Sequence, residues 1–233
     1  MNSPGEAPKE WLSFSLAFVG GFGDAAGFVL AKTFTGHITG NLVLAAVSLT
    51  AADWRTTAAR LLAVVFFLAG ILLSVFLVRL PATRLWPSLL TAAFAAELIL
   101  IISSSIALMS HATIGIEIFV LCLSLALGLQ NGAFRRAGGI SVHTTYLTGM
   151  ITGLMVTEAE NFFSTGRTPA SHSLKVGLLY GIWVCFFLGA ATGAALVFHF
   201  KEVGMLGLAL VLLILTVRNS ISAQPARPAG RSA

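Results

Sequence analysis

Eight long apolar runs, separated by short polar connections, follow one another along the chain. They cover residues 11–31, 35–52, 57–80, 85–109, 113–134, 140–157, 173–198 and 203–217. A helix needs about 20 mainly apolar residues to cross the hydrocarbon core of a bilayer. Six runs meet or approach this requirement, and the pattern therefore predicts an all-α, polytopic membrane protein with about six full spans.

Two of the runs differ from the other six. Residues 35–52 begin TGHITGN and residues 140–157 begin ISVHTTYLTGMITG, so both open with hydroxyl groups and glycines. Backbone without regular helical hydrogen bonds is tolerated at membrane depth only where protein or water covers it. We expect these two runs to form short broken or re-entrant helices.

The distribution of Lys and Arg decides between eight spans and six, because cytoplasmic connections carry an excess of both. If all eight runs cross, with the N-terminus inside, the two sides hold 8 and 6 basic residues. If the two polar runs enter and leave on one face, the cytoplasmic side holds 10 and the outer side keeps Lys32, Arg55, Arg60 and Lys201. The six-span topology makes residues 1–10 a short cytoplasmic N-terminus and residues 218–233 a disordered cytoplasmic tail.

Composition narrows the classes of function. Hydrophobic residues make up 57% of the 233 residues and charged residues 10%, against about 25% charged in a soluble domain. No connection is long enough for a soluble domain, so we expect function within the bilayer, with membrane lipids as immediate partners. The net charge of +5 comes from basic residues scattered singly or in pairs, which does not favour nucleic-acid binding.

The two polar runs belong to a longer internal similarity. Residues 20–41 read GGFGDAAGFVLAKTFTGHITGN, and residues 128–150 read GLQNGAFRRAGGISVHTTYLTGM. Each places a short acid or amide, Asp24 or Asn131, at a Gly-rich helix end, and each closes on a Thr-Gly step that starts an apolar helix. The following helices also echo one another, with FFLAG from Phe66 against FFLGA from Phe186.

This similarity predicts two halves, residues 11–109 and 113–217. Each half holds three full spans, and an odd number of spans inserts the second half upside down relative to the first. Inverted-topology repeats of this kind place their interrupted helices near the bilayer midplane, where free backbone groups face a binding site.

The motifs D-A-A-G-F, F-T-G-H-I-T-G-N, G-L-Q-N-G-A-F-R-R and T-T-Y-L-T-G resemble those of the YoaK-type bacterial inner-membrane proteins, a family catalogued as a domain of unknown function. The resemblance covers nearly the whole chain. It implies a multi-pass protein of the bacterial inner membrane and a permease-like function, without naming a substrate. The family usually has a small residue or Pro where His143 stands, so the resemblance implies no role for that side chain.

The polar groups of the two motifs are the candidate substrate-binding residues: Asp24, Thr35, His37, Thr39, Asn41, Gln130, Asn131, His143, Thr145 and Thr148. An acid inside a span is costly to bury and should face the bundle interior with a partner. Asp24 could bind a substrate or carry a proton, or it could cap backbone N–H groups near residues 35–39. Gln130 and Asn131 could bind a ligand or satisfy broken backbone, and His37 could titrate or only pack.

Glu97 and the spaced glycines each have a structural and a functional interpretation. Glu97, central in its run, could be a coupling acid or could pair with Arg135 or Arg136. Glycines recur four apart at 23/27, 36/40, 128/132, 149/153 and 189/193. This spacing favours close helix packing, and at the last pair it also suits a homodimer.

No nucleophile–base pair, phosphate loop or Cys/His cluster is present in the sequence, so we expect no enzyme activity, metal or cofactor. The preferred function is a small secondary transporter, channel or permease-like protein whose small-molecule or ion substrate is unknown. The alternative is a non-transporting membrane protein, such as a lipid-binding or assembly partner, in which the motifs only pack helices.

Overall fold

The computed structural model describes residues 10–79, 89–110, 114–134, 136–137, 140–141, 147–163 and 170–222. In order, these form α1 (Glu10–Ala31), α2 (Ile38–Thr50), α3 (Trp54–Arg79), α4 (Leu89–Met109), α5 (Gly115–Ala133), β1 (Arg136–Ala137), β2 (Ile140–Ser141), α6 (Leu147–Phe163), α7 (Ala170–Phe200), the 3-10 helix η1 (Lys201–Met205) and α8 (Leu206–Ser222). The predicted all-α polytopic architecture is confirmed. The antiparallel pair β1–β2 is a local addition to it.

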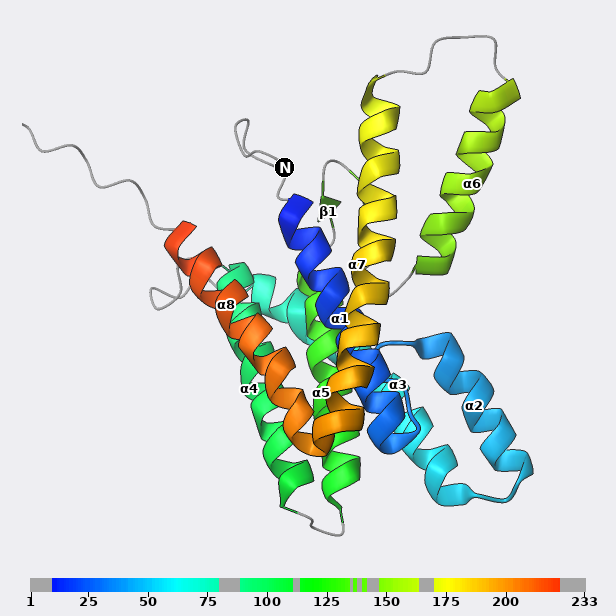
Figure 1. The fold of residues 1–233 in the computed structure, drawn as a ribbon. Helices are drawn as coiled ribbons and strands as arrows, with labels where there is room; N and C mark the ends of the chain where they lie inside the picture. Colours follow the sequence, from blue (N-terminus) through cyan, green and yellow to red (C-terminus); the bar gives the residue numbers. More distant parts are fainter. Residues whose placement is uncertain are drawn as a thin grey trace, which may run out of the picture.

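Five of the described helical stretches are long and apolar enough to cross a bilayer: Glu10–Ala31, Trp54–Leu77, Thr91–Met109, Gly115–Ala133 and Val176–Ile221. The last has 46 residues and contains α7 from Val176 on, all of η1, and α8 up to Ile221. The chain reverses at η1, and α8 returns alongside α4 (Figure 1). This stretch therefore holds two passes.

The core lies around α5, which packs against α1, α3 and α4 (Figure 1). Phe119, Leu123 and Leu127 of α5 are fully buried. On the outer helices large apolar side chains point away from the bundle, and Phe187 of α7 is 68% exposed. Such a surface would aggregate in water, but in a bilayer it is the lipid-facing surface.

The first polar motif interrupts the chain between α1 and α2. Helix α1 ends at Ala31, and Lys32 has a φ of 54°, which turns the chain out of the helix. Helix α2 has 13 residues and is therefore about 20 Å long, too short to span. In Figure 1 it starts beside the middle of the bundle and runs back toward the end where α1 stops.

Arg60 of α3 links the start of this interruption to the middle of α2. Its guanidinium donates to the carbonyl oxygen of Lys32 at 3.2 Å and to that of Leu44 at 2.5 Å. Lys32 and Arg60 therefore lie at one end of the bundle, whereas eight crossings would place them on opposite sides of the membrane. The contact agrees with a re-entrant segment over residues 32–53.

Cysteine labelling tests this topology. In a background with Cys122 and Cys185 replaced by alanine, a membrane-impermeant maleimide should label Lys32→Cys and Thr56→Cys from the same side of the membrane. The excess of basic residues elsewhere predicts that this is the outer side. Glu10→Cys, at the opposite end of α1, is the matched control and should react only from the inside. Labelling of the first two positions from opposite sides would restore the eight-span topology.

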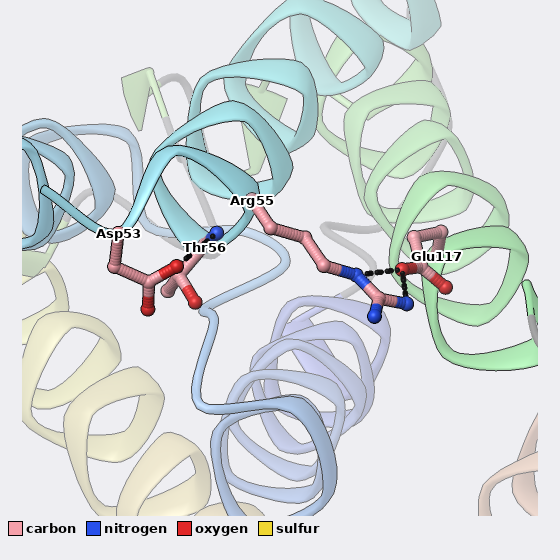
Figure 2. A network of polar contacts seen from close by, with 4 residues as sticks. All are labelled: Asp53, Arg55, Thr56 and Glu117. Carbon is pink, nitrogen blue, oxygen red and sulfur yellow. Dashed lines mark hydrogen bonds and ion pairs between the residues drawn. The ribbon is translucent and has the colours of Figure 1, made fainter.

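The N-terminal turns of α3 and α5 are tied together at this same end (Figure 2). Nε of Arg55 donates to Oε1 of Glu117 at 2.9 Å, and the two side chains form an ion pair. Oδ1 of Asp53 accepts the backbone N–H of Thr56 at 3.1 Å and so caps α3. The hydrogen bond from the Thr56 hydroxyl lowers the pKa of Asp53 most, and the one from the Thr56 backbone lowers it further.

Helices α1 and α7 cross backbone to backbone. A Cβ placed on Gly21 would lie 2.0 Å from the carbonyl oxygen of Phe186. A Cβ on Gly189 would lie 2.0 Å from the carbonyl oxygen of Phe18. Gly189 and Gly193 face α1 of the same chain, so this pair is an intramolecular crossing and not the surface of a homodimer.

Helices α3 and α5 cross in the same way. A Cβ on Gly128 would lie 2.0 Å from the carbonyl oxygen of Phe67, and one on Gly70 would lie 2.2 Å from that of Leu125. Close packing at glycines was predicted for Gly128, and it is confirmed there. It is wrong for Gly153, where an added Cβ would meet nothing within 4 Å.

The two crossings are equivalent in sequence position. Gly21 and Gly128 are 107 residues apart, as are Phe18 and Leu125, whose carbonyl oxygens lie against Gly189 and Gly70. Phe67 and Phe186 are 119 residues apart. Phe67 and Phe186 are thus equivalent positions in the two halves, because their carbonyl oxygens lie against the equivalent glycines Gly128 and Gly21. Aligning the two FFL segments letter by letter paired Phe66 with Phe186, which is wrong by one residue.

The prediction of a disordered tail is wrong for residues 218–222. Helix α8 continues through Ser222, and Nδ2 of Asn219 donates to the hydroxyl of Thr91 in α4 at 2.8 Å. Residues 218–222 therefore belong to the helical bundle, because this buried side-chain contact holds the last turn of α8 against α4. Residues 223–233 and 1–9 lie outside the described part of the chain.

Candidate functional site

Asp24 lies in the latter half of α1 and holds the interruption that follows. Its Oδ1 accepts the backbone N–H groups of Thr35 at 3.0 Å and of Gly36 at 2.5 Å. The carboxyl group is buried, and its second oxygen, Oδ2, has no hydrogen-bond partner among the described residues. The capping role left open by the sequence is thus present, and it engages one of the two carboxyl oxygens.

Thr35 and Gly27 complete the contact between α1 and the interrupted backbone. The hydroxyl of Thr35 donates to the carbonyl oxygen of Gly23 at 3.1 Å. A Cβ on Gly27 would lie 2.8 Å from the methyl group of Thr35. Glycines one turn apart on α1 therefore make the surface on which the interrupted segment sits.

Asn41 holds the same segment from the other side. Its Oδ1 accepts the N–H of Phe34 at 3.0 Å, and its Nδ2 donates to the carbonyl oxygen of Phe34 at 2.6 Å. One amide side chain thus satisfies both backbone groups of a residue that lies outside any helix. Asp24 and Asn41 together account for three N–H groups and one carbonyl of residues 34–36.

His37 precedes the first residue of α2 and makes no side-chain cap for that helix. Its ring centroid lies 5.4 Å from that of Phe34, and Phe34 in turn stacks on Phe28 at 4.7 Å. His37 is half-buried, whereas Thr39, two residues later, is exposed on α2. In the first motif, Asp24, Thr35 and Asn41 therefore hold the interrupted backbone together. His37 packs beside it on Phe34, whereas Thr39 points away from it.

The second motif is only partly described. Gln130 and Asn131 are buried near the end of α5. Nε2 of Gln130 donates to the carbonyl oxygen of Leu16 in α1 at 3.0 Å, and Nδ2 of Asn131 donates to that of Leu127 at 2.9 Å. Thr148 is exposed at the second position of α6. The candidates His143 and Thr145 lie outside the described residues, as does the suggested pairing of Glu97 with the Arg135 or Arg136 side chain.

The two motifs nevertheless occupy matching places. Asp24 follows the crossing glycine Gly21 by three residues, and Asn131 follows Gly128 by three. Thr39 and Thr148 are each the second residue of the next helix, α2 and α6. The predicted Thr-Gly helix starts are confirmed, and each motif begins one helical turn beyond a tight crossing.

Two features of the site were not found from the sequence. Gly21 and Gly70 do not belong to a pair of glycines four apart on one helix, so the spacing did not predict their contacts with another helix. Aligning the halves would have found them. Arg60 was treated only as a topology marker, and its hydrogen bonds to Lys32 and Leu44 could not be read from spacing. In the described part of the chain no three His, Cys, Asp or Glu side chains gather to hold a metal.

Comparison with known proteins places this architecture in a family. A family model described as "Protein of unknown function (DUF1275)" matches residues 12–218. The chain belongs to this family. The DUF1275 chain is 27% identical over 141 residues to the UPF0700 transmembrane protein YoaK of Bacillus subtilis strain 168.

That alignment covers 60% of this DUF1275 chain and 63% of the relative, which is under two thirds of the relative's length. The resemblance to YoaK-type proteins is thereby confirmed, as is the multi-pass membrane character. No solved structure matches this DUF1275 chain.

Proposed function

We propose that the protein is a small secondary transporter or permease-like protein of the bacterial inner membrane, not an enzyme. Its substrate site would lie between the two interrupted segments near the bilayer midplane. The observation that carries this proposal is the difference between the two carboxyl oxygens of Asp24. One of its oxygens holds the interruption, and the other is buried without a hydrogen-bond partner among the described residues.

A purely structural cap would not need this second oxygen. Buried polar atoms are rarely left without partners, because each costs free energy comparable to a lost hydrogen bond. An unengaged carboxylate oxygen can accept a hydrogen bond or a positive charge from a bound solute. The substrate class that this chemistry favours is a small molecule with a donor group, or a cation.

The equivalence of the two halves supports the same proposal. In Figure 1, α1 and α5 run in opposite directions, and so do α2 and α6, α3 and α7, and α4 and α8. We infer that residues 11–109 and 113–217 are inverted-topology repeats. Repeats of this kind form midplane sites at their interface, and alternating access arises when one half rocks against the other.

The Asp24→Asn variant tests the site. It keeps the Oδ1 acceptor and the side-chain volume, so the apo protein should melt within a few degrees of wild type. A thermal-shift screen of the purified protein against amino acids, sugars, polyols, carboxylates and monovalent cations should find a stabilising solute, since binding stabilises by about 2.7 kcal/mol at 100 times Kd. That shift should be lost in Asp24→Asn, as should uptake of the same solute into proteoliposomes.

His37→Gln is the companion variant, because it removes the neighbouring titratable ring and leaves Asp24 intact. It should change the pH dependence of uptake without abolishing binding. Full binding and uptake in Asp24→Asn would remove Asp24 from the site. A solute that binds but is never accumulated by wild-type vesicles would instead favour the non-transporting role, in which the motifs serve only packing or lipid contact.

A further inference from the structure

The buried carboxyl group of Asp24 lies next to a run of aromatic side chains. Its Oδ1 accepts the backbone N–H groups of Thr35 and Gly36. The residues directly before and after this pair are Phe34 and His37, and their ring centroids lie 5.4 Å apart. The two backbone hydrogen bonds therefore fix the carboxyl group beside the segment that carries both rings.

A third ring comes from α1 itself. Phe28 follows Asp24 by four residues, so the two side chains lie on one face of the helix. The ring of Phe28 stacks on that of Phe34, with the centroids 4.7 Å apart. Phe28, Phe34 and His37 are half-buried, whereas Asp24 is buried. The acid is thus more deeply buried than the three rings around it, whose surfaces are partly accessible.

The basic side chains near this point do not neutralise Asp24. The terminal nitrogens of Arg60 donate to backbone carbonyl oxygens, and Nζ of Lys32 lies over the ring of Phe28. His37 is close enough to interact electrostatically with the carboxyl group. Oδ2 nevertheless receives no hydrogen bond from it or from any other residue that the structure describes. One carboxyl oxygen therefore remains for a cationic donor from outside the chain.

Lys32 shows which kind of cation these rings accept. Its Nζ lies 5.9 Å from the centroid of the Phe28 ring, within the roughly 6 Å over which an aromatic face attracts a cation. The group on the ring is an alkylammonium ion, held there by the chain itself. The same aromatic run is therefore chemically suited to the ammonium group of a solute.

We propose that the site around Asp24 recognises a small organic molecule that carries a primary ammonium group. One N–H of this group would donate to Oδ2 of Asp24, and the rings of Phe28, Phe34 and His37 would contact the adjoining carbon chain. The inference rests on the proposed substrate site. It narrows the ligands of that site from donors and cations in general to organic amines in their charged form.

The surroundings favour an ammonium ion over the other solute classes. Ca²⁺ and Mg²⁺ take about six or more oxygen ligands, whereas aromatic rings occupy positions 28, 34 and 37 beside Asp24. An ammonium ion is satisfied by a carboxylate oxygen together with aromatic faces. A neutral polyol could donate to Oδ2 but would leave the carboxylate charge without a partner. An anion would be repelled by it.

Matched solutes test the proposal on the wild-type protein. The amines 2-aminoethanol and 1,4-butanediamine are charged at neutral pH, and ethane-1,2-diol and 1,4-butanediol are their uncharged counterparts. We expect a saturable rise in melting temperature with at least one amine of a panel from two to six carbons, and none with the matching diol. Calorimetric titration should show the affinity for that amine falling at least about thirtyfold in Asp24→Asn, because a buried charge pair is lost. The comparison of amine with diol stands even if this variant does not fold.

The aromatic part is tested by a matched pair of phenylalanines. Phe34→Leu keeps an apolar side chain without the aromatic face and should weaken amine binding by about three- to tenfold. Phe187→Leu, on the lipid-facing surface of α7 where the side chain is 68% exposed, should leave the affinity unchanged. Equal affinities in the two variants would contradict the role of the rings.

The same measurements separate this inference from the proposed function. No shift with any amine of the panel, or an Asp24-dependent shift produced as strongly by sodium ions or by the diols, would overturn the ammonium site. In the second case the substrate site itself would remain. An amine that binds through Asp24 but is never accumulated by proteoliposomes would have the opposite meaning, because it supports the ammonium site and contradicts transport.

Discussion

Gly128→Ala should lower the free energy of unfolding by about 3 kcal/mol, near the upper end of what overpacking costs. The new Cβ would lie 2.0 Å from the carbonyl oxygen of Phe67, and a backbone atom cannot rotate away as a side chain can. Helices α3 and α5 would have to separate along their whole contact, and each would lose dispersion contacts with the other. Unfolding in mixed micelles with increasing SDS, followed by tryptophan fluorescence, measures the loss.

Gly21→Ala should cost a similar amount, because its Cβ would meet the carbonyl oxygen of Phe186 at the same distance. Gly153→Ala and Gly177→Ala are the controls, since an added Cβ at either position meets nothing within 4 Å. They should be neutral or stabilise by up to about 1 kcal/mol, because alanine favours helix more than glycine does. If the substitution at Gly128 were as harmless as the one at Gly153, the crossing would not be as close as described.

Asp24→Ala should also lower the free energy of unfolding by about 3 kcal/mol. It removes the acceptor of two buried N–H groups, those of Thr35 and Gly36, and each unsatisfied buried donor costs about 1–3 kcal/mol. Asp24→Asn should cost less, because its side-chain carbonyl can still accept both hydrogen bonds. The same SDS unfolding measurement orders the wild type, the asparagine variant and the alanine variant.

Ser15→Ala is the matched control for this series on α1. The hydroxyl of Ser15 donates only to the carbonyl oxygen of Trp11 in its own helix, at 2.9 Å, so its loss leaves no buried donor unsatisfied. We expect a change of less than about 0.5 kcal/mol. An Asp24→Ala protein as stable as Ser15→Ala would mean that the interruption after α1 does not need the carboxylate.

The spans and the interruptions could be predicted because they rest on strong local signals. Long apolar runs indicate helices in lipid, and the Thr-Gly steps at Thr39 and Thr148 coincide with the second residues of α2 and α6. The sequence also indicated that Asp24 could accept hydrogen bonds from backbone N–H groups near residues 35–39. An acid inside a membrane helix must find donors, and this interrupted segment offered the nearest ones.

Other parts depend on contacts that spacing does not reveal. Within two residues after the ends of α1, α2 and α7 stand Lys32, Ala52 and Lys201, each with a φ between 50° and 57°. Glycine is the usual signal for such a conformation, and it is absent at all three. Whether a polar side chain faces the bundle or points away from it is equally hidden: Thr35 is buried against α1, while Thr39 is exposed on α2.

The same crossings have a consequence for biosynthesis. Helix α1 packs mainly on α7, and α3 mainly on α5, so each half finds its closest partners in the other half. When the first four helices have been synthesised, α2 can pack on α3, but α1, α3 and α4 still lack their main partners, α7 and α5. The nascent chain must therefore wait in the bilayer as separate helices until α5 and then α7 are inserted. A chain truncated before α7 would leave α1 with the face around Gly21 uncovered, and membrane quality-control proteases should remove it.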